Sequence, residues 1–213
     1  NKGRLIGVIN IDDVVEIVHE ETNEDMMLLT GAESNDVYRS VFSIFKSRSI
    51  WLVTNLFATI VAASVVGEFQ DIIAQLSILA VLMPIVASMG GTTGQQTLAV
   101  VVRSLATKEL NSRNALRMIG KEFMVGLCNG LLFAVMIGIA VRIWFPGQEM
   151  ISYIIALAML CNLTVASLAG ILIPLTINRL KIDPAIASGV FLIACTDSGG
   201  YFIFLGLAKL LLF

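Results

Sequence analysis

Five long stretches of the chain lack charged side chains almost completely, and short charged segments separate them. The uncharged stretches are residues 49–67, 72–102, 123–141 and 150–178, together with residues 184–208, in which Asp197 is the one charged residue. About 20 predominantly apolar residues are enough for a helix to cross a bilayer. The pattern therefore predicts an all-α membrane protein with five transmembrane helices per subunit.

Polar residues interrupt the second stretch, which contains Pro84 and the glycine-rich run GGTTGQQ at residues 90–96. Polar, glycine-rich backbone at membrane depth is tolerated where it is buried in protein or lines a water-filled cavity. The run therefore predicts an interrupted helix that lines a pathway, and close helix packing through small residues is the alternative. The residues expected to serve one of these purposes are Gly90, Gly91, Thr92 and Gly94.

Other polar residues inside the spans are expected to support the helices. Hydrogen bonds between helices are the expected role of Asn129, Asn162, Thr164 and Ser167. The last span opens with DPA, in which Asp183 can cap the helix and Pro184 fits its first turn.

Asp197 lies deep in the last span, about 20 Å along the helix from Pro184 at 1.5 Å per residue. A charged Asp at the bilayer centre costs at least ~3 kcal/mol. The spans place no Lys, Arg or His at comparable depth, and the one histidine of the chain is His19, outside them. Asp197 is therefore predicted either to carry a proton or to hold a cation in a hydrated pore. A protonated side chain with one structural hydrogen bond is the alternative.

A dimer around a two-fold axis would place two copies of Asp197 face to face, and this symmetry is the commonest among oligomers. The two carboxylates would repel each other by about 4 kcal/mol at 4 Å, and a divalent cation between them would cancel both charges. Oxygen ligands favour Mg²⁺, Ca²⁺ or Mn²⁺. Because Mg²⁺ keeps several waters and needs few protein ligands, it fits best, with Asp197 touching it through water.

The segments before the first span predict two further parts. Residues 1–32 are expected to end a soluble α/β domain, with a strand in GRLIGVIN and a helix in IDDVVEIVHE. Residues 33–48 predict an amphipathic connecting helix, opened by Ser34 or Asn35 and continuous with the first span. Residues 49–213 form the transmembrane domain. Because the chain starts in mid-pattern at Asn1, we expect it to be a piece of a longer protein.

Composition and charge support the membrane assignment and fix its orientation. The chain has 57% hydrophobic and 14% charged residues, whereas soluble domains average about 25% charged residues. With five spans, most basic residues collect on one side: Arg39, Lys46, Arg48, Arg103, Lys108, Arg113, Arg117, Lys121, Arg179 and Lys181. Only Arg142 and Lys209 fall on the other. The positive-inside rule predicts a cytoplasmic N-terminal region and an external C-terminus in the cell membrane.

Two classes of function are not supported by the sequence. The basic residues sit where membrane topology needs them, so no nucleic-acid partner is expected. No nucleophile lies in a recognisable arrangement with a base, so the protein is not expected to be an enzyme.

Three segments together resemble the MgtE family of Mg²⁺ channels. DPAIASGVFLIACTDSGGYF (residues 183–202) looks like the last-helix signature of that family, and GGTTGQQ resembles its second-helix motif. The segment from residue 3 to residue 26 is similar to the end of the paired CBS domain that precedes the membrane part. The resemblance implies a homodimer with the pore on its axis, Asp197 as the pore acid, and backbone carbonyls of Gly189 and Ile193 as further lining.

The same resemblance assigns a sensor role to acidic residues near the membrane. It implies that the soluble part senses cytoplasmic Mg²⁺ through Asp12, Glu33 and Asp36 and closes the pore through the connecting helix. Without the resemblance, an ordinary solvated acidic linker accounts for these residues.

The sequence as a whole predicts a Mg²⁺ channel or facilitative transporter that carries Mg²⁺ into the cytoplasm and is gated by cytoplasmic Mg²⁺. Two alternatives stay open. One is a proton- or Na⁺-coupled divalent-cation transporter in which Asp197 titrates. The other is a membrane receptor that senses ions and conducts nothing.

Overall fold

The structure, a computed structural model, describes residues 9–29, 31–32, 38–110 and 114–212. Over these ranges it contains helices and no strand. The helices are α1 (Ile11–Leu28), α2 (Val41–Gly67), α3 (Gln70–Gln75), α4 (Ile78–Ala106), α5 (Ala115–Trp144), α6 (Glu149–Arg179) and α7 (Pro184–Leu212). Five of them, α2, α4, α5, α6 and residues Ser188–Leu212 of α7, are long and apolar enough to cross a membrane. The prediction of five transmembrane helices is confirmed.

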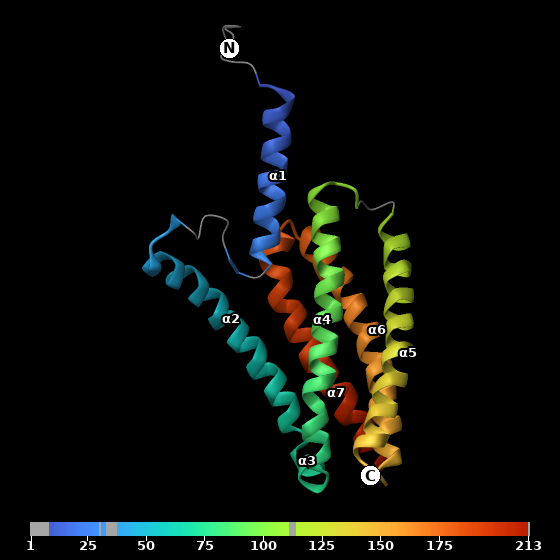
Figure 1. Cartoon of the computed structure of the whole chain (residues 1–213). Coiled ribbons are helices and arrows are strands. Elements are labelled where there is room, and N and C mark those ends of the chain that lie inside the picture. Colours follow the sequence, from blue (N-terminus) through green and yellow to red (C-terminus); the bar gives the residue numbers. More distant parts are fainter. Residues whose placement is uncertain (1–8, 30, 33–37, 111–113, 213) are drawn as a thin grey trace.

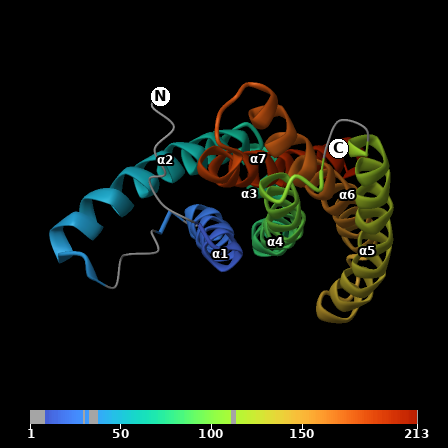
Figure 2. The ribbon, with the colours of Figure 1, turned by 90° about the horizontal axis from the view of Figure 1, so that it is seen from above.

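Helices α4 to α7 form a bundle in which α6 packs against α4, α5 and α7. Helix α2 packs against α7 and leans away from the bundle toward its own N-terminal end (Figures 1 and 2). Helix α1 projects beyond the end of the bundle at which α2 and α7 begin (Figure 1), and it contacts α4 and α7. Because α6 is the shared partner, most of its side chains that face the other helices are buried.

The N-terminal segment agrees with its prediction in part. The predicted helix in IDDVVEIVHE is confirmed as the first part of α1. Asp12 and Asp13 occupy its first turn, where negative charge is favourable, and the Asp13 carboxylate accepts a hydrogen bond from the backbone N–H of Asn10 at 2.9 Å. The predicted strand falls mostly on residues 1–8, outside the described residues, so the assignment of a domain remnant stays a prediction.

The described part of the predicted connecting helix belongs to α2, which begins at Val41. Ser40 is extended (φ −68°, ψ 148°), and its side chain accepts a hydrogen bond from the backbone N–H of Ser43. The N-cap in this part of the chain is therefore Ser40; the predicted caps, Ser34 and Asn35, lie outside the described residues. From Val41 the helix runs without a break to Gly67. Residues 41–48 thus belong to the same helix as the first span, and a separate connecting helix over residues 33–48 stays a prediction.

The predicted interruption of the second span is wrong. Helix α4 continues through Pro84 and through the glycine-rich run to Ala106. The break in the span lies earlier, at Leu76 and Ser77, between α3 and α4. A continuous helix satisfies its own backbone hydrogen bonds, so the glycines are not needed to break it. Gly90 and Gly94 allow close packing instead.

Several glycines allow the helices of the bundle to approach each other closely. A Cβ on Gly94 of α4 would lie 3.0 Å from Leu192 Cδ1 of α7. A Cβ on Gly130 of α5 would lie 2.9 Å from the Leu160 carbonyl oxygen of α6. Small residues give this advantage in membranes, where lipid tails supply no hydrophobic force between helices.

The closest approach to a backbone atom generates a prediction about stability. A Cβ on Gly170 of α6 would lie 2.6 Å from the Gly94 carbonyl oxygen and 2.8 Å from Thr97 Cβ. Because backbone atoms cannot move aside, Gly170→Ala should separate α4 from α6 and lower the free energy of unfolding by about 1–3 kcal/mol. Thermal unfolding of the purified protein in detergent measures this change.

The control is Gly206→Ala in α7, where an added Cβ meets nothing within 4 Å. This change should leave the unfolding temperature unchanged or raise it slightly, since Gly is a poor helix former. Equal unfolding temperatures for both variants would contradict the packing role of Gly170.

Candidate ion pathway along helices α4 and α7

Asp197 lies on one face of α7 with two of the predicted lining residues. Gly189, Ile193 and Asp197 follow each other at four-residue spacing, which places them along the same side of the helix. The Asp197 side chain is partly buried, whereas Cys195 is exposed to the outside of the chain. This face of α7 therefore turns toward the inner part of the molecule and not directly toward lipid.

Helix α4 carries a stripe of exposed polar side chains in the middle of its span. Ser88, Thr92 and Gln95 recur at spacings of four and three residues, and Gln96 lies beside them. The Thr92 hydroxyl donates to the Ser88 carbonyl oxygen at 2.8 Å. Polar side chains at this depth are costly against hydrocarbon. The stripe, which we call the α4 polar stripe, is therefore suited to face water or another protein surface.

A cavity of about 420 Å³ joins the face of Asp197 to the α4 polar stripe. Its walls include Gln95 and Ala99 of α4 and Gly189 and Ile193 of α7. Gly189 and Ile193, whose carbonyl oxygens are predicted to line the pore, thus share this cavity with Gln95 of the glycine-rich run. Helix α7 is continuous here, so these carbonyl oxygens already accept helical hydrogen bonds and offer their second lone pairs.

The connection between α1 and α2 covers one end of this cavity. Leu29 and Trp51 also line it. A Cβ on Gly189 would lie 2.9 Å from the Leu29 carbonyl oxygen and 3.4 Å from Trp51 Cζ2. Gly31 has φ +71°, a conformation that favours glycine, and its Cα packs against the Trp51 ring. These contacts place the C-terminal end of α1 directly against α7 at Gly189, and we call this end of the cavity the entrance.

Asn162 of α6 joins three helices close to the level of Asp197. It is 1% exposed, and its side-chain amide donates to the Val86 carbonyl oxygen of α4 at 2.7 Å. The side chain also fills the space above Gly90 of α4 and Gly200 of α7, where an added Cβ would lie 2.5 Å and 3.2 Å from Nδ2. Since Gly200 follows Asp197 by three residues, Asn162 fixes the position of that turn of α7.

The other polar residues expected to bond between helices do not do so among the described residues. Thr164 donates to the Leu160 carbonyl oxygen of its own helix at 2.8 Å. The buried Ser167 hydroxyl has no partner, and the side chain of Asn129 forms no hydrogen bond with the described residues. Ser167 lies against Gly126 of α5. Its side chain is therefore buried by close packing against a small residue and not by a hydrogen bond.

The remaining predicted site residues have different roles and places. An added Cβ on Gly91 would meet nothing within 4 Å, so this glycine leaves open space beside the α4 polar stripe. Asp183 accepts a hydrogen bond from the backbone N–H of Ala185 at 2.8 Å, which confirms its capping role. Asp12 is exposed on α1, while Glu33 and Asp36 lie outside the described residues. No cluster of three or more His, Cys, Asp or Glu side chains forms within the described part of the chain.

Three residues of this region were not expected from the sequence. Trp51 covers the cavity at residues 189–193, and Asn55 of α2 has a buried side-chain oxygen without a partner. Glu122 of α5 accepts a hydrogen bond from the Thr97 hydroxyl of α4 at 2.9 Å. Glu122 stands at the edge of an uncharged stretch, which was a signal for a special role. Its partner depends on which helices pack together, and the sequence pattern does not specify that.

Comparison with known proteins identifies relatives of the chain. The family model MgtE, described as a divalent cation transporter, matches residues 83–207. The magnesium transporter MgtE of Enterococcus faecalis is 34% identical over 206 residues, which cover 97% of this chain and 45% of that protein. The magnesium transporter MgtE of Bacillus subtilis is 31% identical over 205 residues, covering 96% and 45%. That of Thermus thermophilus is 29% identical over 215 residues, covering 99% and 47%. The chain thus spans less than half the length of these relatives.

The three-helix junction at Asn162 generates a prediction. Asn162→Ala removes the hydrogen bond to the Val86 carbonyl oxygen and leaves space beside Gly90 and Gly200. Hydrogen bonds between membrane helices contribute about 0.6 kcal/mol on average and up to about 1.7 kcal/mol, and the empty space adds a further cost. We expect a loss of about 1–3 kcal/mol in unfolding free energy, measured by denaturant titration in detergent.

Asn129→Ala is the matched control, because Asn129 forms no hydrogen bond among the described residues. It should change the unfolding free energy by less than about 0.5 kcal/mol, as is usual for positions without a special role. An equal loss in both variants would show that the junction does not depend on the amide of Asn162.

Proposed function

The chain belongs to the MgtE family of divalent cation transporters, and from this premise we propose that it carries Mg²⁺ into the cytoplasm along the face shared by α4 and α7. It is a multi-pass membrane transporter and not an enzyme. All three relatives are named magnesium transporters. The observation that carries the proposal is the α4 polar stripe, which is exposed in the middle of a span and continues into a cavity on the face of Asp197.

Asp197 supplies the charge that attracts the ion. Mg²⁺ gives up its waters reluctantly and is usually held by one or two carboxylates and several waters. A hydrated ion is therefore suited to Asp197 as a contact through water. Thr92, Gln95 and the carbonyl oxygens of Gly189 and Ile193 are the oxygen atoms that the pathway offers to the hydration shell of an ion at other points along its course.

A homodimer is the assembly that best satisfies the α4 polar stripe. One chain leaves these side chains at its surface, where hydrocarbon would make them costly. A second copy related by a two-fold axis would enclose both stripes around a shared aqueous path and would contribute a second Asp197. The proposed pore then lies on the dimer axis, and a divalent ion offsets the repulsion between the two carboxylates.

The proposed orientation places the beginning of α2 and α7 in the cytoplasm. The basic residues of the chain gather at the end of the bundle where α2, α5 and α7 begin and where α4 and α6 end. The positive-inside rule assigns that end to the cytoplasm and the C-terminus to the outside. The α1–α2 connection then covers the cytoplasmic end of the cavity.

Regulation by cytoplasmic Mg²⁺ forms a second part of the proposal. The contact of Leu29 with Gly189 means that any shift of α1 against α7 changes the entrance. Asp12 on α1, together with Glu33 and Asp36 near the start of α2, would repel one another until Mg²⁺ binds between them. Bound Mg²⁺ then favours the closed arrangement by its difference in affinity between the two states.

Substitution of Asp197 tests the pathway. Asp197→Asn keeps the shape of the side chain and removes its charge, so it should abolish Mg²⁺ flux into liposomes while the protein stays folded. Cys195→Ala, two residues away on the exposed side of α7, should leave flux unchanged. Normal flux in the Asp197 variant contradicts the proposal. A flux in the parent protein that depends on a proton or Na⁺ gradient favours the coupled transporter, and no flux under any gradient favours the receptor.

Neutralising the acidic residues of the connection tests the regulation. Glu33→Gln combined with Asp36→Asn in the intact protein should preserve conduction and move closure to higher cytoplasmic Mg²⁺. A loss of roughly 1–3 kcal/mol in coupling free energy corresponds to about a 5–150-fold higher Mg²⁺ concentration for closure. Patch recording at varied cytoplasmic Mg²⁺ measures this concentration. Glu24→Gln, an exposed acid on α1, is the control. Closure of all forms at the same Mg²⁺ concentration would identify residues 33 and 36 as a solvated linker.

A further inference from the structure

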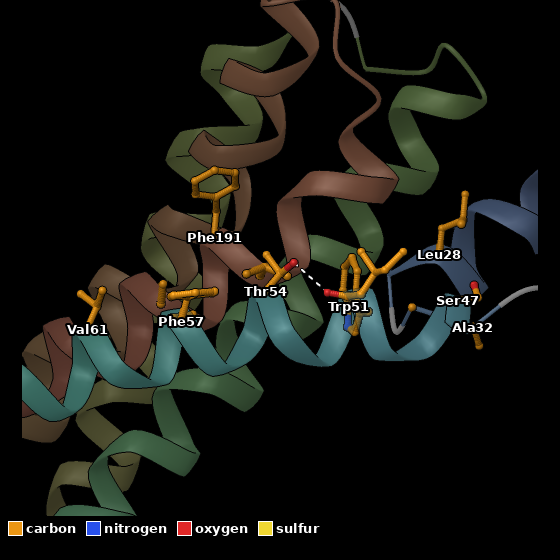
Figure 3. Close-up of a pocket in the computed structure, with 13 residues that line it drawn as sticks. Leu28, Ala32, Ser47, Trp51, Thr54, Phe57, Val61 and Phe191 are labelled. Atoms are coloured by element: carbon orange, nitrogen blue, oxygen red, sulfur yellow. Dashed lines mark hydrogen bonds between the residues drawn. The ribbon is translucent and has the colours of Figure 1, made fainter. Parts of the chain in front are cut away.

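A large apolar cavity lies between α2 and α7. Its volume is about 600 Å³, within the range of pockets that enclose small ligands. Its lining includes Phe57, Ala58 and Val61 of α2 together with Phe191 and Ala194 of α7. Figure 3 labels Phe57, Val61 and Phe191 among them. The hydroxyl of Thr54 also lines it but donates to the Ile50 carbonyl oxygen of its own helix at 2.9 Å (Figure 3). The cavity therefore presents an almost entirely hydrocarbon surface.

The cavity is long enough to span the hydrocarbon half of a bilayer that belongs to one leaflet. Its wall on α2 extends from Ser47 to Val61, about 21 Å at 1.5 Å per residue. Half of the hydrocarbon core of a bilayer is about 15 Å thick. An acyl chain that enters beside Ser47 thus has room along the cavity to the depth that a leaflet requires. A water-filled cavity of this length is disfavoured, because its walls offer few hydrogen-bond partners.

A second cavity with a basic side chain adjoins the first. It has a volume of about 350 Å³ and is lined by Arg48 and Leu52 of α2, together with Gly31, Ala32 and Trp51, which also line the apolar cavity. The two cavities therefore meet around Trp51. An arginine side chain is well suited to phosphate, because its planar group donates two parallel hydrogen bonds. Arg48 lies at the end of α2 where basic residues gather, and cytoplasmic leaflets carry anionic lipid.

We propose that the cleft between α2 and α7 is a binding site for one anionic phospholipid. The acyl chain fills the apolar cavity, and the phosphate group lies beside Arg48 in the second cavity. One phospholipid molecule fits both cavities at once, because its apolar acyl chain is joined directly to its negative phosphate group, as the apolar cavity adjoins the cavity of Arg48. The inference requires that α2 and α7 cross a membrane, and it does not depend on which ion the protein carries.

The two tryptophans of the chain allow a direct test. Trp51 lines both cavities, whereas Trp144 ends α5 at the opposite end of the bundle and is exposed. Trp144→Phe leaves Trp51 as the sole tryptophan of this chain, which is excited selectively at the red edge of its absorption. The protein is reconstituted in phosphatidylcholine vesicles that contain, at one mole fraction, brominated phosphatidylglycerol or brominated phosphatidylcholine. We expect the anionic lipid to quench Trp51 with about fivefold higher relative affinity, the factor expected for one basic side chain near a membrane surface.

Variants in this background separate the role of Arg48 from general charge. Arg48→Gln should remove the preference for phosphatidylglycerol, and Arg48→Lys should retain most of it. Lys46→Gln is the matched control, because Lys46 lies two residues earlier on α2 and lines neither cavity; it should keep the preference. Ala194→Phe fills the apolar cavity and should reduce quenching by either brominated lipid.

Three outcomes would overturn the proposal. Equal quenching by both lipids identifies ordinary lipid contact without a site. A preference that survives Arg48→Gln assigns the selectivity to another group. Absence of quenching by either lipid shows that a second copy of the chain, and not a lipid, covers the cleft. Each outcome is independent of Mg²⁺ flux, so failure of the lipid site and failure of the proposed transport function are distinguishable.

Discussion

The absence of water from the bilayer core is the constraint on which the rest of this structure depends. Backbone groups at that depth must be satisfied within the chain, which explains why the described spans are continuous helices even where glycines and Pro84 stand in the sequence. Polar side chains face the same constraint. Asn162 meets it with a hydrogen bond to another helix, and Thr92 bonds to the carbonyl oxygen of Ser88. The α4 polar stripe, still exposed at the surface of one chain, needs water or a second chain.

Close packing around α6 turns this constraint into a defined geometry. Gly90, Gly94 and Gly170 let α4, α6 and α7 approach so closely that side chains and backbone atoms of neighbouring helices touch. Helix α7 is thereby held on one side by α4 and α6, while the apolar cavity and α2 lie on another. Asp197 is therefore carried by a helix whose position is fixed mainly by the contacts of small residues, and a single carboxylate can be placed without any ion pair to orient it.

The sequence was sufficient to predict the number of spans, because a long uncharged stretch of about 20 apolar residues is most readily accommodated as a membrane-spanning helix. It was also sufficient for the cap at Asp183, which depends on neighbouring residues alone. It failed for the glycine-rich run, since local composition is compatible both with a broken helix and with a packed one, and the choice depends on Asn162 and Leu192 from distant parts of the chain. The cavity beside Gly189 and Ile193 was equally beyond the sequence pattern, because Trp51 and Leu29 reach it from other elements.

The position of Trp51 gives the proposed regulation and the proposed lipid site a common physical element. Its ring contacts Gly31 of the α1–α2 connection, lines the cavity beside Gly189, and forms the boundary between the apolar cavity and the cavity of Arg48. Helix α2 is continuous from Val41 through this residue into the membrane, so a displacement of the connection must either move Trp51 or bend α2. A bound lipid that fills the space beside the ring would resist that movement, because interiors without voids transmit displacement and do not absorb it. Occupancy of the cleft and the state of the entrance should therefore depend on each other, and linkage requires that each affects the other by the same free energy.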